Sequence, residues 1–555
     1  MTGGPAGAAS RAPAVPLPVP PPMPPSAGAG PAPGFGAFVA RARAAGVLVV
    51  QPRMGMADPL RMRDGLRATR DADAVTVGTV TLDSYTRTGD LDAARRALAE
   101  GVGLNGYPIA NHPAETTRTL LRGVMDARFP VQVRHGSAMP EHIVRALLAV
   151  GLDATEGGPV SYCLPYSRTP LREAVTAWRR SCELLASVGE HGSEPHLETF
   201  GGCLMGQLCP PSLLIAVSVL EALFFRQHGL NSVSLSYAQQ ADPRQDEEAL
   251  TVLARLAGEL LPDVDHHVVL YAYMGVFPRS PGGARLLLED AARLAVRAGA
   301  ARLIVKTTAE AHRIPTVGEN VRALETAAAA AADERARPAL SAVPGALGFG
   351  TADTSTTAAV TDTGIEAEAR ALIGAVLELD ADVGRALVRA FAAGYLDVPY
   401  CLHPDNAGRA RTSLAPDGRL LWSSVGSMPI AGLAADGPRP PILGSAGLIS
   451  ALSHVQRTYD DRAADPSVLP VAADPCALPV AADPCALPVA AGPCALPVAA
   501  DLSVLPVAAG PSVLTAAADP ARPRVPPSPP VPPSPPVPPR TTSSTPRREL
   551  GPTTP

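Results

Sequence analysis

The sequence predicts an α/β fold: a (β/α)8 barrel of the TIM type, with a small C-terminal α+β domain and disordered Pro-rich tails. Three observations support this prediction. From about residue 46, short β-branched runs alternate with longer stretches rich in Ala, Leu and Arg. A polar or charged residue closes most of these runs. Between the two Pro-rich ends roughly 425 residues remain, which is enough for a barrel and a smaller domain.

Nine runs are candidate strands, one more than the barrel needs. A helical stretch follows each run, and this alternation is typical of parallel strands joined by helical crossovers. The length of the chain favours a closed barrel over an open, doubly wound sheet. One of the nine must be a misread loop or lie outside the barrel, and the sequence does not say which. In order they are Val47–Gln51, Ala74–Val80, Leu104–Gly106, Val131–Arg134, Ala154–Glu156, His196–Phe200, Val233–Tyr237, Val268–Tyr273 and Arg302–Lys306.

Composition divides the chain into four segments. Residues 1–34 are a Pro-, Ala- and Gly-rich tail, 35–340 the barrel, 341–460 the α+β domain and 461–555 a second Pro-rich tail. We expect both tails to be disordered, because frequent proline forbids helix and removes sheet donors. The second tail contains six nonapeptide copies, which are either a tether or docking arm or the product of drift in a repetitive coding segment.

The α+β domain is predicted from a change of pattern after the barrel. Residues 341–365 are rich in Gly, Thr and Ala and form a linker. Helical periodicity then runs over Glu366–Ala392, and Asp397–Pro429 has the turn residues and short apolar runs of small strands.

Composition also excludes several classes of protein. A net charge of −5 gives no reason to expect nucleic acid or an anionic membrane as a partner. The most apolar stretch, Leu213–Phe225, is too short to span a bilayer, and the N-terminus lacks the apolar segment of a signal peptide, so we expect a cytoplasmic protein. The cysteines show no zinc-ligand spacing, and no strand is followed by a dinucleotide or P-loop motif. We expect no metal site in this chain.

Polar side chains gather where the predicted strands end, which is the edge of a barrel that carries active sites. Three arginines from separate strands, Arg53, Arg87 and Arg134, could hold two carboxylates, because guanidinium groups match carboxylates in shape. Glu156 suits a substrate ammonium group or a proton transfer. This combination points to an acidic amino acid as substrate. The other polar residues of the set are Asn105, Gln132, His135, Tyr162, Tyr166, Glu198, Lys306 and Glu310.

Lys306 is the only lysine in the sequence, which contains 47 basic residues. It closes the apolar run that begins at Arg302. Every other Lys/Arg position in the sequence is arginine. We therefore expect the ammonium of Lys306 to lie in a site that a planar guanidinium would not fit. We interpret Lys306, with Glu156, as a catalytic residue.

Seven segments resemble, in order, the large subunit (epsilon, or E) of methylaspartate mutase, also called glutamate mutase. The resemblance extends from about residue 36 to 457. The segments are Gln51–Gly55, Thr81–Arg87, Leu104–Pro108, Gln132–Gly136, Thr155–Tyr166, Met274–Pro278 and Ile304–Glu310.

The resemblance implies a barrel that rearranges L-glutamate to (2S,3S)-3-methylaspartate by an adenosylcobalamin radical mechanism. It implies that the substrate is bound by Arg53, Arg87, Gln132, Arg134, His135, Glu156, Tyr162 and Tyr166. It implies that adenosylcobalamin is contacted by Gly55, Asn105, Pro165, Phe277, Lys306, Glu310 and Ile314, with Lys306 and Glu310 near the adenosyl ribose.

The resemblance also implies a partner. Cobalamin proteins of this class bind cobalt through a histidine in a D-x-H-x-x-G segment, which this sequence lacks. A separate small cobalamin-binding subunit, sigma or S, would supply it, and we expect a dimer of this chain within a heterotetramer. Two alternatives remain at this point: a cofactor-free (β/α)8 lyase or epimerase, and a binding or scaffold protein, each for an acidic amino acid.

Overall fold

The computed structural model describes residues 34–337, 363–433 and 440–465. The predicted N-terminal tail except Gly34, most of the linker and nearly all of the Pro-rich C-terminal tail lie outside the described residues.

Eight parallel strands form the centre of the fold, in the order β1-β8-β7-β6-β5-β4-β3-β2. The remaining gap, between β1 and β2, is closed by a parallel bridge from Val50 to Thr76, where the Val50 amide donates to the Val75 carbonyl at 2.9 Å. The predicted barrel is thereby confirmed. The strands are β1 Val49–Gln51, β2 Gly78–Thr81, β3 Val131–Arg134, β4 Ala154–Gly157, β5 His196–Thr199, β6 Ser232–Ala238, β7 Asp265–Tyr271 and β8 Arg302–Ile304.

One of the nine candidate strands, the third along the chain, was wrong. Leu104–Gly106 lies in a loop that crosses the end of β2, and only the next residue, Tyr107, makes a bridge, to Leu82. A Cβ on Gly106 would lie 2.5 Å from the Leu82 carbonyl carbon, so this loop packs backbone against backbone. Asn105 and Gly106 are residue types disfavoured in strands, which agrees with the loop.

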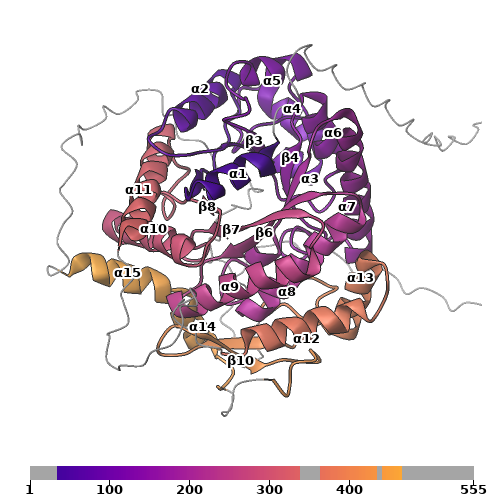
Figure 1. Ribbon diagram of the computed structural model, residues 1–555, viewed down its shortest axis with the longest axis vertical. Coiled ribbons are helices and arrows are strands. Elements are labelled where there is room, and N and C mark those ends of the chain that lie inside the picture. The colour runs from indigo at the N-terminus through magenta and orange to yellow at the C-terminus, as the bar shows by residue number, and fades with distance from the viewer. Residues whose placement is uncertain (1–33, 338–362, 434–439, 466–555) are drawn as a thin grey trace, which may run out of the picture. The chain divides into compact units, whose positions relative to one another are not determined.

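Helices surround the barrel, as Figure 1 shows. Aspartates 58, 90 and 242 accept hydrogen bonds from the first turns of α2, α4 and α9, which explains where these helices begin. The helices are α1 Phe35–Ala44, α2 Pro59–Arg70, α3 Ser84–Thr88, α4 Leu91–Ala99, α5 Ala114–Leu121, α6 Glu141–Ala149, α7 Leu171–Ala186, α8 Pro211–Gln227, α9 Pro243–Leu260, α10 Pro281–Arg297 and α11 Val317–Ala336.

The C-terminal segment packs on the outside of the barrel, beside α8, α9 and α10 (Figure 1). The predicted helical stretch Glu366–Ala392 is two helices, separated by a turn around Asp380. Glu368 ties this segment to α8, because it accepts hydrogen bonds from Ser212 at 2.6 Å and from the Trp422 indole at 3.1 Å. Its elements are α12 Ile365–Leu377, α13 Val383–Ala393, the antiparallel pair β9 Arg411–Leu414 and β10 Leu420–Ser424, α14 Ser445–Leu452 and α15 His454–Ala464.

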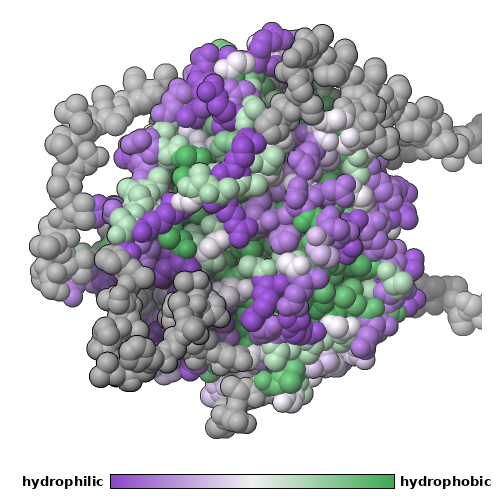
Figure 2. Space-filling view, viewed as in Figure 1, coloured by the Kyte–Doolittle hydropathy of each residue, from purple (hydrophilic) through white to green (hydrophobic). Residues whose placement is uncertain are grey.

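No helix among the described residues is long and apolar enough to cross a membrane. The apolar α8 is instead buried along almost its whole length, between the strands and α12. Hydrophilic residues are spread over much of the face in Figure 2, among smaller hydrophobic areas.

The inside of the barrel is unusually polar. Bulky apolar residues normally fill such barrels, but here the fully buried guanidinium of Arg302 binds Glu198, Gln51 and Ser234. Gln51 in turn donates to Gln132 at 2.8 Å. Beneath this layer α1 covers the other end of the barrel, where the Phe35 ring stacks on His196 and lies 5.0 Å from the Arg302 guanidinium. Arg302 is therefore enclosed and hydrogen-bonded within the barrel.

Glu221 of α8 holds the loops that follow β4 and β5. Its buried carboxyl accepts hydrogen bonds from the backbone amides of Val160, Ser161 and Phe200 at 3.2, 2.9 and 3.3 Å, and from the Ser161 hydroxyl at 3.0 Å. Burial raises the pKa of Glu221 to about 7. This single side chain thus organises two loops at the C-terminal end of the barrel.

We expect Glu221→Ala to lower the free energy of unfolding by about 2–4 kcal/mol, because it leaves buried backbone amides without acceptors. Urea unfolding followed by circular dichroism measures this loss. Glu183→Ala on α7 is the matched control, since that carboxylate is 54% exposed and its removal should change stability by less than about 0.5 kcal/mol. Equal stability of the two variants would contradict the anchoring role of Glu221.

Candidate active site

The predicted site residues lie at or just beyond the C-terminal ends of the strands. Arg53 and Gly55 follow β1, Arg87 and Asn105 follow β2, and Arg134 and His135 end or follow β3. Glu156 is in β4, and the loop after it carries Tyr162, Pro165 and Tyr166. Phe277 follows β7, and Lys306, Glu310 and Ile314 follow β8. The barrel topology therefore brings these loops to one end.

One cluster centres on Glu156, which is 1% exposed. Its Oε2 lies 2.8 Å from the guanidinium of Arg134, also buried, and the hydroxyl of Tyr162 donates to its Oε1. A further tyrosine, Tyr271 of β7, lies with its hydroxyl 2.9 Å from Oε2 and its ring 5.0 Å from the Arg134 guanidinium. Burial raises the pKa of Glu156, and Arg134 opposes that rise.

Aromatic rings wall this cluster. Tyr162 lies edge-on to His135 at 5.2 Å and 4.9 Å from Phe200, and Tyr166 lies 6.0 Å from Tyr162. Behind them, Trp178 of α7 stacks on His135 at 5.8 Å. These rings shield the carboxyl of Glu156 from water on the side toward the helices.

Three buried donors in this region have no protein partner among the described residues: Arg87 Nε, Arg134 Nη1 and His135 Nε2. The His135 Nδ1 accepts from the Ser137 amide at 3.1 Å, and burial lowers the pKa of His135 to about 3, so the neutral ring carries its proton on Nε2. Burial also lowers the pKa of Arg87. Unpaired buried donors are costly, and here they come from α3 and from the C-terminal end of β3, as a site for an anionic ligand requires.

A second cluster surrounds the lone lysine. The Lys306 ammonium lies 2.8 Å from Glu310 and 5.3 Å from the ring centre of Phe277, and Arg53 reaches the same Glu310 oxygen at 3.4 Å. Burial lowers the pKa of Lys306, and Glu310 partly offsets this. Burial raises the pKa of Glu310, but Lys306 and Arg53 outweigh it and the pKa lies below its ordinary value. Lys306 is 5% exposed, so an arginine would have to displace its neighbours.

The other predicted cofactor residues form the edge of this end of the barrel. Ile314 is 67% exposed, and Tyr166, a predicted substrate residue, is 46% exposed, which leaves apolar surface uncovered. The Asn105 side chain donates to the Ser84 hydroxyl at 2.6 Å and accepts from the Ser84 amide, so it fixes the start of α3, the helix that carries Arg87. At Gly55 a Cβ would lie 2.1 Å from the Thr81 carbonyl oxygen, which excludes any side chain there.

Gln132 lies deeper inside the barrel than the other predicted substrate residues. It is fully buried, accepts from Gln51 and donates toward the Thr155 carbonyl and Glu198 at 3.3 and 3.4 Å. Its contacts connect the mouth of the barrel to the polar interior.

Three residues of the site were missed in the sequence: Tyr271, Arg302 and Glu221. Tyr271 lies in an apolar strand run and Glu221 in an apolar helix, where each has the pattern of a core residue. Arg302 begins the run that ends at Lys306, and only the register of the sheet turns its side chain into the barrel. An isolated charge within an otherwise apolar run is the signal that could have identified Arg302 and Glu221.

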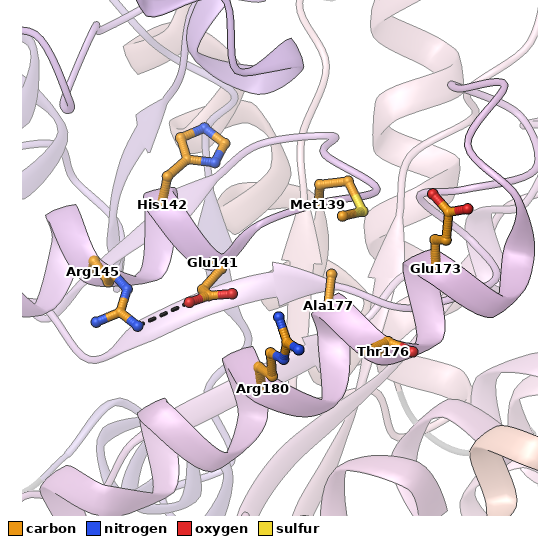
Figure 3. Close-up of a pocket in the computed structure, with 8 residues that line it drawn as sticks. All are labelled: Met139, Glu141, His142, Arg145, Glu173, Thr176, Ala177 and Arg180. Atoms are coloured by element: carbon orange, nitrogen blue, oxygen red, sulfur yellow. Dashed lines mark hydrogen bonds and ion pairs between the residues drawn. The ribbon is translucent and has the colours of Figure 1, made fainter. Parts of the chain in front are cut away.

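A separate pocket of about 470 Å³ lies between α6 and α7 (Figure 3). Arg145 and Glu141 form an ion pair there at 2.8 Å, and Glu173 and Arg180 line it from α7. None of the predicted site residues lines this pocket. Within the described ranges, no group of three or more His, Cys, Asp or Glu side chains is arranged to hold a metal ion.

Comparison with known proteins identifies the family. The family model described as methylaspartate mutase E chain (MutE) matches residues 31–439. A glutamate mutase epsilon subunit of Halobacterium salinarum is 32% identical over 70% of this chain and 80% of its own length. Those of Haloarcula marismortui and Desulfitobacterium hafniense are 32% and 30% identical, over 67% and 71% of this chain and 74% and 81% of their own lengths. This chain therefore belongs to the methylaspartate mutase E chain family.

Proposed function

We propose that this chain is the catalytic large subunit of an adenosylcobalamin-dependent methylaspartate mutase, which rearranges L-glutamate to (2S,3S)-3-methylaspartate. One observation carries the proposal: unpaired buried donors on Arg87, Arg134 and His135 lie at the same end of the barrel as a buried carboxyl, Glu156, which pairs with Arg134. Family membership does not favour the cofactor-free lyase or the binding protein.

The donors suit a dicarboxylate. Arg134 already uses one nitrogen on Glu156, and its Nη1 remains free for a substrate carboxylate. The neutral His135 adds an N–H without adding charge. Arg87 supplies a further charged donor, and charge-assisted hydrogen bonds of this kind fix both position and direction. A glutamate held at both carboxylates presents its central carbons in one orientation.

Glu156 would receive the substrate ammonium. Its Oε1 and Oε2 are held by Tyr162, Arg134 and Tyr271, so the carboxyl cannot rotate. Fixed groups of this kind lose little freedom when a ligand binds, which is the physical basis of preorganisation. The aromatic wall keeps water away from the same carboxyl.

The second cluster fits adenosylcobalamin. Lys306 and Glu310 offer a donor and an acceptor side by side, a combination suited to ribose hydroxyls, and Phe277 provides an apolar ring beside them. Exposed Ile314 and Tyr166, with Asn105, Gly55 and Pro165 in the neighbouring loops, leave apolar surface for a large flat group. When bound, the cofactor supplies the carbon radical that abstracts a substrate hydrogen. The chain's own residues then have to orient the substrate and exclude water.

The chain would act with a small sigma subunit, because its sequence lacks the D-x-H-x-x-G segment that provides the lower cobalt ligand in such proteins. We propose a dimer of this chain within a cytoplasmic heterotetramer. The decisive experiment measures 3-methylaspartate formed from L-glutamate by this chain and adenosylcobalamin, with and without a separately made small subunit. Product only with all components supports the proposal, and product without cobalamin contradicts it.

Arg134→Lys should lower kcat/KM for L-glutamate by about 100-fold or more, because one ammonium cannot hold Glu156 and a substrate carboxylate in the same geometry. Steady-state kinetics of the reconstituted enzyme measure this. Arg145→Lys is the control, since that arginine pairs with Glu141 in the α6/α7 pocket (Figure 3) and should leave kcat/KM unchanged.

Lys306→Arg should lower turnover about 10- to 100-fold and leave the affinity of the free chain for L-glutamate unchanged, because the larger guanidinium displaces Phe277 and Glu310 but not the Glu156 cluster. Calorimetry of the free chain gives the affinity, and the coupled assay gives turnover. A loss of glutamate affinity would place Lys306 in the substrate site instead.

A further inference from the structure

Three oxygen-to-oxygen contacts connect the carboxyl groups of Glu156 and Glu198. The Tyr162 hydroxyl contacts Glu156 Oε1, and the Tyr271 hydroxyl lies 2.9 Å from Glu156 Oε2. The same Tyr271 hydroxyl also contacts Glu198 Oε1. The two carboxyls are 1% and 0% exposed, so water does not separate them.

These contacts favour a third proton. Two oxygens lie at hydrogen-bond distance without repulsion only when a proton lies between them. Tyr162 and Tyr271 supply one each, and a single Tyr271 proton shared between two ionised carboxyls would leave two negative charges close together in a buried site. A third proton on one of the two carboxyls, which makes that carboxyl neutral, removes this repulsion.

The remaining contacts indicate which carboxyl is neutral. Glu198 Oε2 binds Arg302, the Ser234 hydroxyl at 3.1 Å and the Gln132 amide at 3.4 Å. Within residues 34–337, 363–433 and 440–465, Glu156 has a single ion-pair partner, Arg134 at 2.8 Å, which must also serve the substrate. The protein partners of Glu198 therefore stabilise a negative charge better than those of Glu156 do.

Electrostatics agree with this assignment. The groups facing Glu156 are Arg134, Glu198, Tyr162 and Tyr271. Burial and the nearby Glu198 charge raise the pKa of Glu156, while Arg134 and the two tyrosines act to lower it. Burial also raises the pKa of Glu198, but Arg302 and Arg134 outweigh it, so that pKa lies below its ordinary value. His196 and His267, which lie beside Arg302, have lowered pKa values because they are buried, and they add no charge.

We propose that Tyr271 bridges a protonated Glu156 to an ionised Glu198, and that Arg302 is the positioning residue that keeps the charge on Glu198. In this arrangement Glu156 donates its proton to Tyr271, and Tyr271 donates to Glu198. If the proposed function holds, a substrate ammonium that reaches Glu156 ionises it, and the displaced proton leaves to solvent. The bridge thus couples substrate binding to proton release.

Infrared difference spectroscopy of the full chain near pH 7 tests the bridge without substrate or cofactor. Wild type minus Glu156→Gln should show one C=O band of a protonated carboxyl. The same difference taken in a Tyr271→Phe background should show that band at higher frequency, because the carboxyl has lost its acceptor. Tyr273→Phe is the control: its hydroxyl donates to Gln207 at 3.2 Å and contacts neither carboxyl, so the band should not move.

Two outcomes would overturn the bridge: no protonated-carboxyl band assigned to Glu156, or an unchanged band in Tyr271→Phe. The first outcome needs no Tyr271 variant, so the absence of a Glu156 band would overturn the bridge even if that variant fails to fold.

Calorimetry in buffers of different ionisation enthalpy tests the coupling. L-Glutamate binding to wild type should release about one proton per site, and binding to Glu156→Gln none. Binding without proton release would overturn the coupling. Failure of wild type to bind glutamate would instead count against the proposed function, while the infrared result would still decide the bridge.

Discussion

The buried ion pair between Arg302 and Glu198 is the interaction on which the site depends. Both side chains are 0% exposed, and a charge without a partner in such a place would cost several kcal/mol. Because Arg302 also binds Gln51 and Ser234, four strands contribute to one hydrogen-bonded layer. The layer sets the position of Glu198, Glu198 sets that of Tyr271, and Tyr271 contacts Glu156 at the mouth.

The mouth itself contains two charge clusters with different tasks. Around Glu156, Arg134 and the tyrosines form a rigid, largely enclosed pocket suited to a small dicarboxylate. Around Glu310, Lys306 and Arg53 form a second ion-pair cluster, and the exposed Ile314 lies four residues further along the same loop. Glu221 holds the loops after β4 and β5 through three backbone amides and the Ser161 hydroxyl.

Most of the fold could be predicted, because strand runs and helical stretches carry different periodicities. The one wrong strand, Leu104–Gly106, shows the limit: it was predicted from its place in the alternation, although Asn105 and Gly106 are disfavoured in strands. Among the site residues, Arg134, Glu156 and Lys306 stood out because a charge at the end of an apolar run is conspicuous. Tyr271 was concealed inside such a run, where a buried tyrosine that packs and one that bridges two carboxyls have the same pattern.

The sequence by itself determined the alternation of strands and helices, the family, and the charged groups at the strand ends, since each of these is a property of residue order. Tertiary structure alone decided which charges are paired, which donors remain free and how many protons the Glu156 cluster holds. These are properties of distance between side chains on different strands. A pairing such as Arg302 with Glu198, 104 residues apart, exists only once the barrel has closed.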